Sequence, residues 1–384
     1  MSTTIKQKPV VPELRFSGFD GEWNKEKLGQ VAEFWNGKAH EQEINADGKY
    51  VVVNSKFVST EGRIRKFSNQ LTSELRTGDI ALVMSDIPNG KAIGKCYLIK
   101  ENKRYTLNQR IGGIRSENII SPFLHSILNR NKYFLAFDNG VSQTNLRKDE
   151  VLSCPLIYPE LDEQQKIADF LGSIDAWLDN LRSQKTALQS YKQGMMQKLF
   201  TGQVRFKDEA GKSFPDWEEK ELGELLSYKQ PTEFIVESTE YKDEYKTPVL
   251  TAGKTFILGY TDETKGVYDY ELPVIIFDDF TTATKFVDFK FKVKSSAMKI
   301  LVPLDGHNAQ FLFEAIQQIQ FEVGGHGRQW ISKYSRIPVS TPSAEEQSKI
   351  GDFILSVDKL VAAKEKEVAK VEEWKKGLMQ KMFV

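Results

Sequence analysis

The chain has 384 residues, and its 53 basic side chains balance its 53 acidic ones. This length predicts two or three domains, and a hydrophobic share of 40% is enough for real cores. Two cysteines, Cys96 and Cys154, exclude a disulfide framework and fit a reducing compartment. The N-terminal stretch lacks the apolar segment of a signal peptide, and no run approaches the ~20 apolar residues of a membrane span. We therefore expect a soluble, cytoplasmic protein.

The zero net charge hides an asymmetry along the chain. Residues 24–150 carry 20 basic and 14 acidic side chains, whereas residues 218–333 carry 13 and 19. The first region is therefore a candidate polyanion binder on charge alone. The second region would need to gather its basic groups on one face to bind a polyanion.

Two segments far apart in the chain begin alike, with Arg-Phe and then a tryptophan five residues before Leu-Gly. They contain Arg15-Phe16, Trp23 and Leu28-Gly29, and then Arg205-Phe206, Trp217 and Leu222-Gly223. We expect each tryptophan to anchor the start of a folded module.

Each module then continues with short runs rich in Val, Ile, Phe and Tyr, which are typical of strands. The predicted strands lie within residues 50–58, 78–85 and 95–100, and within residues 247–258, 272–280 and 285–293. A shorter helix is predicted in each module, over residues 121–134 and 308–319. Each body is therefore predicted to be α+β with a curved sheet, and about 130 residues is large enough for its own core.

A long helix is predicted to follow each body, over residues 162–200 and 345–383. The two helix sequences match without a gap at an offset of 183 residues, which relates Phe170 to Phe353 and Phe200 to Phe383. A self-match of this length indicates two copies of one module. The Ser343 and Glu346 pair predicts a capping box at the second start, and Gly202 predicts the first end. Each helix would span roughly 57 Å.

Apolar residues in both helices recur at steps of three, four or seven, which predicts the seam of a coiled coil. The seam residues are Ile167, Leu171, Ile174, Leu178, Leu181, Leu188, Met195 and Leu199, and then Ile350, Ile354, Val357, Val361, Val368, Val371, Leu378 and Met382. Lys185 and Lys364 interrupt the two seams at non-equivalent places, which favours one pairing of the helices. Two amphipathic helices on separate cores remain the alternative.

A glycine-rich loop with amide side chains closes each body, at residues 140–146 and 324–331. Such a loop suits a close approach to a base edge and equally a tight turn into the next strand.

Motifs for several chemistries are missing from the sequence. There is no phosphate-cradling G-x-x-x-x-G-K-[S/T], no G-x-G-x-x-G, no C-x-x-C and no H-E-x-x-H. The acidic residues Asp86, Asp278 and Asp279 have no supporting E-x-K pattern, so we expect neither catalysis nor a metal site in this chain.

The helix motifs resemble one protein family. The run D-E-Q-x-K-I-A-D-F-L after Pro159, ending in K-Q-G-M-M-Q-K-L-F-T-G, is similar to the central conserved helix of specificity subunits of type I restriction-modification systems. The second run, E-E-Q-S-K-I-G-D-F to K-K-G-L-M-Q-K-M-F, is similar to the distal one. The loop G-V-S-Q-T-N-L resembles the end of a target-recognition domain in this family, whereas G-G-H-G-R-Q-W-I departs from the common pattern.

This resemblance implies a pseudo-two-fold repeat of two α/β target-recognition domains separated by two long helices packed as an antiparallel coiled coil. The implied domains are residues 1–155 and 203–340, with helical spacers at residues 156–202 and 341–384. Such a subunit is not catalytic. Each recognition domain would read one half of a bipartite, asymmetric site in double-stranded DNA, and the helices would set the gap between the halves.

The resemblance also implies the partners. Two methyltransferase subunits would dock on the helices, and two restriction and translocation subunits would join them. The cofactors S-adenosylmethionine, ATP and Mg²⁺ would bind those partners and not this chain.

Candidate DNA contacts are polar and basic residues in the loops of both bodies, since Arg suits guanine, Asn and Gln suit adenine, and Lys suits phosphate. In the first body they are Asn54, Lys56, Arg63, Arg65, Lys66, Gln109, Arg110, Ser142, Gln143 and Asn145; in the second they are Lys254, Thr284, Lys285, His326, Arg328 and Gln329. Two other hypotheses remain: a coiled-coil scaffold that does not bind DNA, and an enzyme with a carboxylate site at Asp278.

Overall fold

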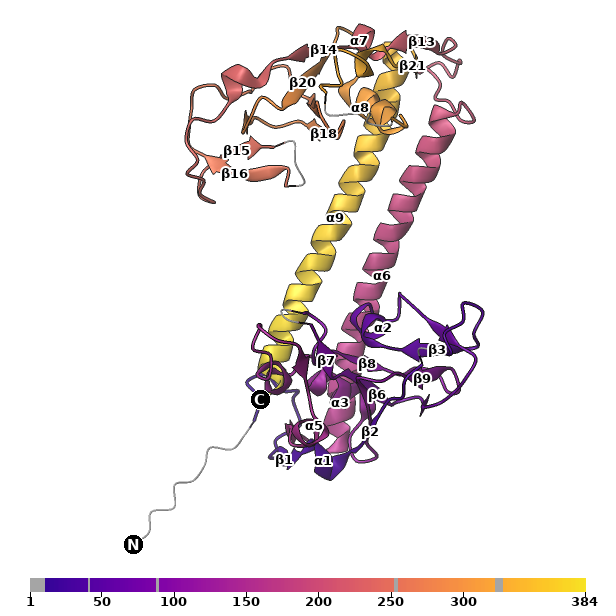
Figure 1. Ribbon diagram of the computed structural model, residues 1–384, viewed down its shortest axis with the longest axis vertical. Helices are drawn as coiled ribbons and strands as arrows, with labels where there is room; N and C mark the ends of the chain where they lie inside the picture. The colour runs from indigo at the N-terminus through magenta and orange to yellow at the C-terminus, as the bar shows by residue number, and fades with distance from the viewer. Residues whose placement is uncertain (1–10, 41, 88–89, 252–254, 322–326) are drawn as a thin grey trace. The chain divides into compact units, whose positions relative to one another are not determined.

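The computed structural model describes residues 11–40, 42–87, 90–251, 255–321 and 327–384. The chain forms two compact units, which we call unit one (residues 1–181 with 367–384) and unit two (residues 182–366). Each unit contains one α+β body and a portion of both long helices, α6 (Leu161–Phe200) and α9 (Ala344–Met382) (Figure 1).

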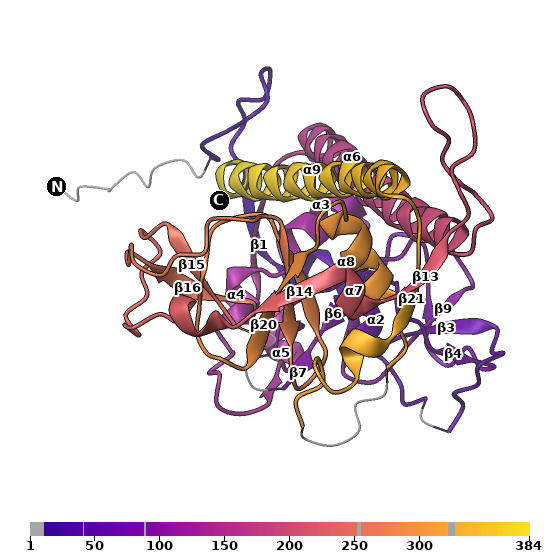
Figure 2. The same ribbon diagram turned by 90° about the horizontal axis from the view of Figure 1, so that it is seen from above.

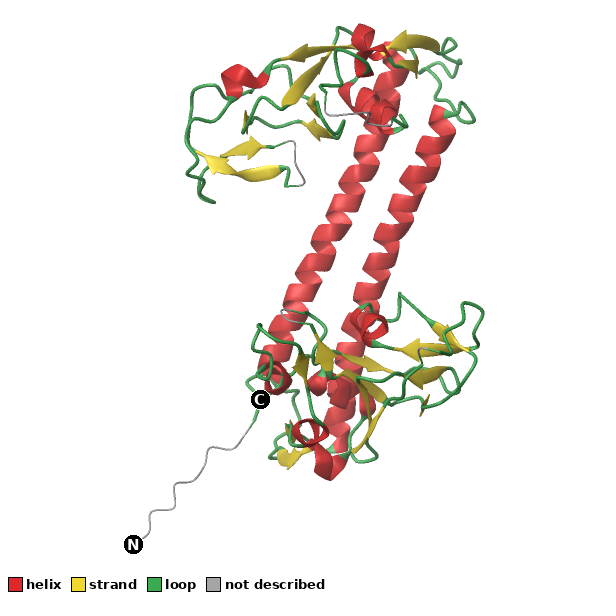
Figure 3. Cartoon of the chain, viewed as in Figure 1, coloured by secondary structure: helices red, strands yellow, loops and turns green. Residues whose placement is uncertain are grey.

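The body of unit one is built mainly of short strands, with five short helices among its described residues (Figure 3). The strands are β1 (Asn24–Lys27), β2 (Glu33–Asn36), β3 (Tyr50–Val53), β4 (Phe67–Ser68), β5 (Glu74–Leu75), β6 (Ile80–Val83), β7 (Ser85–Asp86), β8 (Cys96–Leu98), β9 (Tyr105–Leu107), β10 (Ile111–Arg115), β11 (Thr144–Asn145) and β12 (Pro155–Tyr158). The helices are α1 (Leu28–Val31), α2 (Ser55–Ser59), α3 (Ser121–Leu128), α4 (Lys132–Leu135) and α5 (Lys148–Leu152).

The body of unit two repeats this composition. Its strands are β13 (Glu218–Glu221), β14 (Leu226–Lys229), β15 (Thr247–Leu250), β16 (Ile257–Thr261), β17 (Val274–Asp278), β18 (Thr284–Val287), β19 (Lys292–Val293), β20 (Met298–Pro303) and β21 (Pro338–Thr341). Its helices are α7 (Leu222–Leu225) and α8 (Ala309–Gln317), with 3-10 turns η1 (Pro231–Phe234) and η2 (Tyr334–Arg336). Helix α8 packs against β17, β18 and β20. Figure 2 shows α8 in the same body as β14 and β20.

The two bodies share one topology although their sequences differ. In each, the first and last strands pair, as β1 with β12 and β13 with β21. Each has an antiparallel four-stranded sheet, in the order β2-β10-β6-β8 or β14-β20-β17-β18. Each has a further sheet with one parallel pair, β3 with β9 or β15 with β19. The internal repeat therefore includes the bodies as well as the helices.

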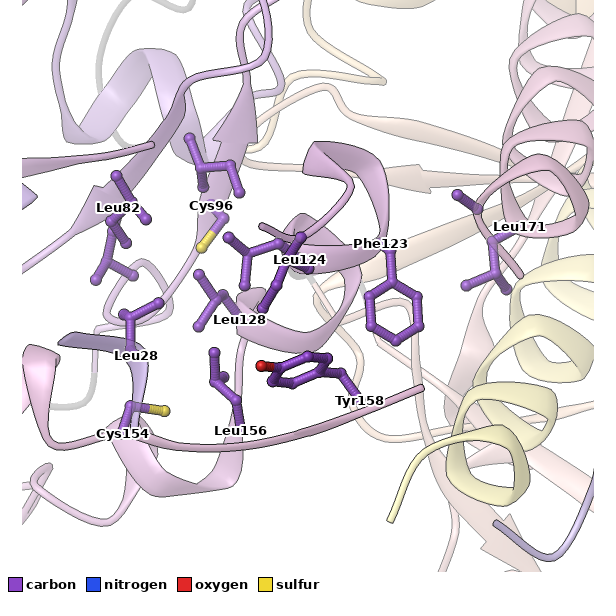
Figure 4. Packing of buried hydrophobic residues seen from close by; sticks show 14 of the residues in the cluster. Leu28, Leu82, Cys96, Phe123, Leu124, Leu128, Cys154, Leu156, Tyr158 and Leu171 are labelled. Carbon is purple, nitrogen blue, oxygen red and sulfur yellow. The ribbon is translucent and has the colours of Figure 1, made fainter. Parts of the chain in front are cut away.

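The core of unit one lies on both faces of the central strand β6. Leu82 faces a cluster that includes Phe123 of α3 and Leu171 of α6 (Figure 4). Its neighbours Ala81 and Val83 face a second cluster. Successive side chains of a strand point to opposite faces, so one four-residue strand joins two cores. In unit two, β17 does the same, with Ile275 and Phe277 on one face and Val274 and Ile276 on the other.

Both long helices were predicted within one residue of their observed bounds. Beyond the first helix, Gly202 has φ +71°, the left-handed conformation that a helix C-terminus favours for glycine. Only one half of the predicted capping box forms as expected: the Ser343 hydroxyl accepts from the Glu346 N–H at 3.4 Å. The Glu346 carboxylate binds Arg205 instead, so the capping-box prediction was wrong for that half.

The helices pack against each other within each unit, and in unit two the contacts are antiparallel. Lys185 forms an ion pair with Glu365 at 2.6 Å, and Lys192 forms one with Asp358 at 2.8 Å. All predicted seam residues are buried or half-buried. Lys185, which interrupts the first seam, therefore places its charge against a carboxylate of the other helix.

A glutamate at the start of each long helix holds the lead-in segment of its body. In unit one, Glu163 accepts two hydrogen bonds from Arg15, both of 2.7 Å. In unit two, Glu346 accepts two from Arg205, of 3.1 and 2.6 Å, and a third from Trp217 Nε1 at 3.1 Å. These contacts explain why the Arg-Phe segments recur.

The glutamine after each glutamate ties the helix to its body. The Gln164 side chain donates to Pro159 O at 2.8 Å and accepts from Ile120 N at 2.9 Å. Gln347 repeats this with Pro342 O at 2.9 Å and Asn308 N at 3.0 Å. Ile120 and Asn308 are the N-cap residues of α3 and α8. The Glu-Gln pair therefore fixes both the lead-in segment and the body helix.

Several predicted element bounds were wrong. The run at residues 50–58 is strand only to Val53, because the Asn54 side chain accepts from Phe57 N at 2.9 Å and caps helix α2. The runs at residues 247–258 and 285–293 each contain parts of two strands, and residues 121–134 contain two helices. Among the described residues, no helix is both long and apolar enough to cross a membrane.

Candidate nucleic-acid interface

The end of strand β6 brings two predicted recognition loops of the first body side by side. Met84 N donates to Arg110 O at 3.1 Å, and Leu146 N donates to Met84 O at 2.7 Å. The turn that carries Gln109 and Arg110 and the loop that ends at Asn145 therefore flank the same residue. Arg110 is exposed and has φ +68°.

Three polar side chains form a network at this point, which we call the amide triad: Ser85, Gln143 and Asn145. The Ser85 hydroxyl donates to Asn145 Oδ1 at 2.7 Å and accepts from Gln143 Nε2 at 2.8 Å. Gln143 Nε2 also lies 3.3 Å from Asn145 Oδ1. Gln143 and Asn145 are exposed, whereas Ser85 is buried. The sheet thus presents to solvent two amide groups whose orientations are coupled through the Ser85 hydroxyl.

The glycine-rich loop before the triad is a tight turn. Asn139 Oδ1 accepts from Val141 N at 3.0 Å and from Ser142 N at 3.1 Å, and Gly140 has φ +69°. The tight turn that the sequence allowed is therefore observed, and it exposes Ser142 beside the triad. A close approach to a base edge stays a prediction.

The other candidates of the first body lie on α2 and the loop after it. Lys56, Arg63, Arg65 and Lys66 are all exposed. Arg63 Nε donates to Thr60 O at 3.0 Å, and Arg65 Nε donates to Gly62 O at 2.9 Å. These bonds use one N–H of each guanidinium, so both keep donors for a ligand. Asn54 is instead the N-cap of α2, which uses its side-chain oxygen.

In the second body the matching loop is anchored by a buried carboxylate. Asp279 follows strand β17, and its Oδ1 accepts from Gln329 N at 3.1 Å and from Trp330 N at 2.9 Å. Arg328, directly before these residues, is exposed. The Gln329 side chain is only 2% exposed, which speaks against a direct base contact by this residue. Lys254 and His326 lie outside the described residues.

Two further candidates lie on strand β18. Lys285 is exposed, and the Thr284 hydroxyl accepts a hydrogen bond from Gln317 of α8. Thr284 is therefore partly occupied by a contact within the body.

The acidic pair Asp278 and Asp279 serves the fold. Asp278 Oδ1 accepts from Phe280 N at 2.9 Å and Thr281 N at 3.3 Å, which closes the turn after β17. Asp279 Oδ2 lies 3.7 Å from Lys299 Nζ, and both side chains are buried. Burial lowers the pKa of Lys299, and nearby Asp279 opposes that shift. Among the described residues, no group of three or more His, Cys, Asp or Glu side chains could hold a metal ion.

Sequence reasoning missed Ser85, Asp279 and Lys299 as supports of these loops. Ser85 lies within a run predicted as strand, and nothing in its sequence neighbourhood marks it as a partner of residues about sixty positions away. Only the pairing of β7 with β11, which sets Ser85 opposite Asn145, brings them together.

The comparisons with known proteins agree with this architecture. The sequence pattern of the family described as "Type I restriction modification DNA specificity domain" matches residues 20–189 and 215–373. The specificity subunit of the Escherichia coli type I restriction enzyme EcoR124I/EcoR124II is 47% identical over 150 residues, which is 37% of either chain. A putative type I restriction enzyme MjaX specificity subunit of Methanocaldococcus jannaschii is 25% identical over 79% of this chain and 76% of its own.

Solved structures are similar in fold. The S subunit of a type I restriction-modification system from M. genitalium has a TM-score of 0.68 at 18% identity, over 98% of this chain and 99% of that one. A chain from a type I restriction-modification assembly has a TM-score of 0.50 at 16% identity, over 93% and 95%. Two α/β bodies with two long packed helices are thus a known fold.

Two matches to one family pattern, one in each half, cover most of the chain. The chain belongs to the type I restriction-modification DNA specificity family, the non-catalytic specificity component of type I restriction enzymes.

Proposed function

We propose that each body of this chain reads one half of a bipartite, asymmetric DNA target. The observation that carries the proposal is the repeat itself: one topology occurs twice, and at one matching loop position it exposes Asn145 in the first body but Arg328 in the second. An amide suits adenine and a guanidinium suits guanine. Two similar folds with unlike contact residues are what an asymmetric target requires.

The two long helices would set the gap between the half-sites and dock two methyltransferase subunits. Two restriction and translocation subunits would complete the complex. S-adenosylmethionine, ATP and Mg²⁺ would bind those partners, and the complex would work in the cytoplasm. The contacts of Glu346 and of the two glutamines support the spacer role of the helices, because they tie each body to the start of one long helix.

Mapping methylated adenines in a host that expresses this chain with its methyltransferase subunit tests the proposal. We expect a split motif. Exchange of residues 1–155 for those of another family member should change one half, and exchange of residues 203–340 should change the other. No methylated motif, or one that survives both exchanges, would contradict it. If the chain were instead a coiled-coil scaffold that does not bind DNA, no binding to duplex DNA would be measured, either for the chain alone or for its complex with the partner subunits.

The helical gap can be tested separately. The seam repeats every seven residues, so a seven-residue insertion in both α6 and α9 keeps the seam in register. Such an insertion adds ~10 Å of helix, which corresponds to roughly three base pairs of DNA. We expect both half-sites to stay the same while the gap widens by about that amount. An unchanged gap would refute the role of the helices as a spacer.

The second body has an excess of acidic residues, so the methyltransferase subunits would supply much of the phosphate contact there. The isolated chain should then bind duplex weakly and lose that binding steeply as salt increases. Tight, salt-resistant binding by the isolated chain would contradict this part of the proposal.

A further inference from the structure

The two bodies carry one exposed polar side chain at equivalent places. In the first body, Leu146 N donates to Met84 O at 2.7 Å, directly after strand β6. In the second, Gln329 N donates to Asp279 O at 2.9 Å, directly after the matching strand β17. The residues before Leu146 and Gln329 are therefore structurally equivalent.

These equivalent residues are Asn145 and Arg328, and they need different support. An arginine side chain has only donors, so its orientation does not change what it offers. An asparagine amide offers a donor at one end and an acceptor at the other, and rotation exchanges them. The residue after Met84 is Ser85, and its hydroxyl binds Asn145; the residue after Asp279 is Phe280, which has no such group. The hydroxyl thus occurs in the body that has the amide.

The hydrogen bonds of the amide triad couple the orientations of the two amides. The single hydroxyl hydrogen of Ser85 goes to Asn145 Oδ1, so Gln143 has to approach Ser85 with its NH₂ group. A turned Asn145 amide would bring its own NH₂ group against that of Gln143, 3.3 Å from the present oxygen. Two facing donors are unfavourable, so neither amide can turn alone. If both amides turned together, the exposed donor and acceptor would change places, and the pair would still offer one of each.

Two atoms remain available to a ligand. Among the described residues, nothing accepts a hydrogen bond from Asn145 Nδ2, and nothing donates one to Gln143 Oε1. Both side chains are exposed. The triad therefore presents one donor and one acceptor next to each other.

This pair matches one base edge. In the major groove adenine offers the N7 acceptor and the N6 amino donor. Guanine offers two acceptors, so its O6 would face Gln143 Oε1, and cytosine offers a donor alone. We infer that Ser85, Gln143 and Asn145 together read one adenine of the first half-site, with Ser85 as the positioning residue. This inference rests on the proposed function and adds the base and the residue that orients the reader.

The test is the methylated motif made by the full chain with its methyltransferase subunit. Ser85→Ala should relax one adenine position of one half-site by ~10-fold or more, and leave the other half-site and the gap unchanged. Ser85→Thr keeps a hydroxyl and should keep the motif. Ser126→Ala is the matched control, because the Ser126 hydroxyl donates only to Pro122 O at 2.9 Å on helix α3.

A second variant covers the case in which Ser85→Ala does not fold. Asn145→Asp replaces the exposed donor with an acceptor, so it should abolish the adenine preference at the same position.

Three results overturn the inference while the proposed function stands: a split motif that Ser85→Ala leaves unchanged, a uniform loss of methylation at every position, or relaxation at a position that is not adenine. A wild-type complex that methylates no split motif would remove the proposed function as well.

Discussion

Replacement of Arg205 by alanine should leave the buried carboxylate of Glu346 without its positively charged partner. The Glu346 side chain is 0% exposed and the Arg205 side chain 25%. Loss of one partner from a buried pair typically costs ~3–5 kcal/mol. The lower end applies here, because Trp217 Nε1 still donates to Glu346 at 3.1 Å and Arg205 is partly solvated. We therefore expect the free energy of unfolding of unit two to fall by ~3 kcal/mol.

Thermal and denaturant unfolding of the chain measure this loss, which corresponds to roughly 6–12 °C in the midpoint of unit two. The double variant Arg205→Ala/Glu346→Gln should be more stable than Arg205→Ala alone, because it removes the uncompensated buried charge. Lys220→Ala is the control: its ion pair with Glu218, at 3.3 Å, is exposed, so little stability should be lost. A loss below ~1 kcal/mol for Arg205→Ala, or a double variant less stable than the single one, would refute the reasoning.

Three further outcomes follow from local structure. Burial raises the pKa of Glu263, but hydrogen bonds from Lys292 and from backbone N–H groups outweigh it and hold the pKa below its ordinary 4.5. The stability that Glu263 contributes is therefore present above pH 4.5 and is lost as the pH falls through the folded value. In Glu263→Gln, the free energy of unfolding should depend less on pH in that window, which acid denaturation measures. Burial raises the pKa of Cys96, and that of Cys154 to about 12, so thiol reagents at pH 8 should label them only after unfolding. Gly37→Ala would set a Cβ 2.0 Å from a backbone oxygen and should lower the unfolding free energy by ~2 kcal/mol or more, measured by denaturant unfolding.

The long helices could be predicted because their pattern is local. Steps of three and four along residues 162–200 predict a helix from chain neighbours alone, and the observed helix spans Leu161–Phe200. The bodies were harder, because strand runs such as residues 50–58 contain Asn54, which ends the strand and begins a helix through one side-chain bond. Periodicity does not reveal such a bond in advance.

The amide triad illustrates the same limit at the site. The sequence indicated Gln143 and Asn145 as polar loop residues, but Ser85 lies 58 and 60 positions away from them. The basic loop residues Lys56, Arg63 and Arg65 could be chosen by charge, and their DNA role stays a prediction.

The sequence by itself determined the duplicated plan, the two helices and the family, because repeated apolar spacing and repeated motifs are properties of the chain order. Tertiary structure alone decided that Glu163 and Glu346 clamp Arg15 and Arg205, and that Gln329 is buried while Arg328 is exposed. Hydrogen bonds and burial depend on which distant strands pair and which loops then meet, and no local pattern encodes that.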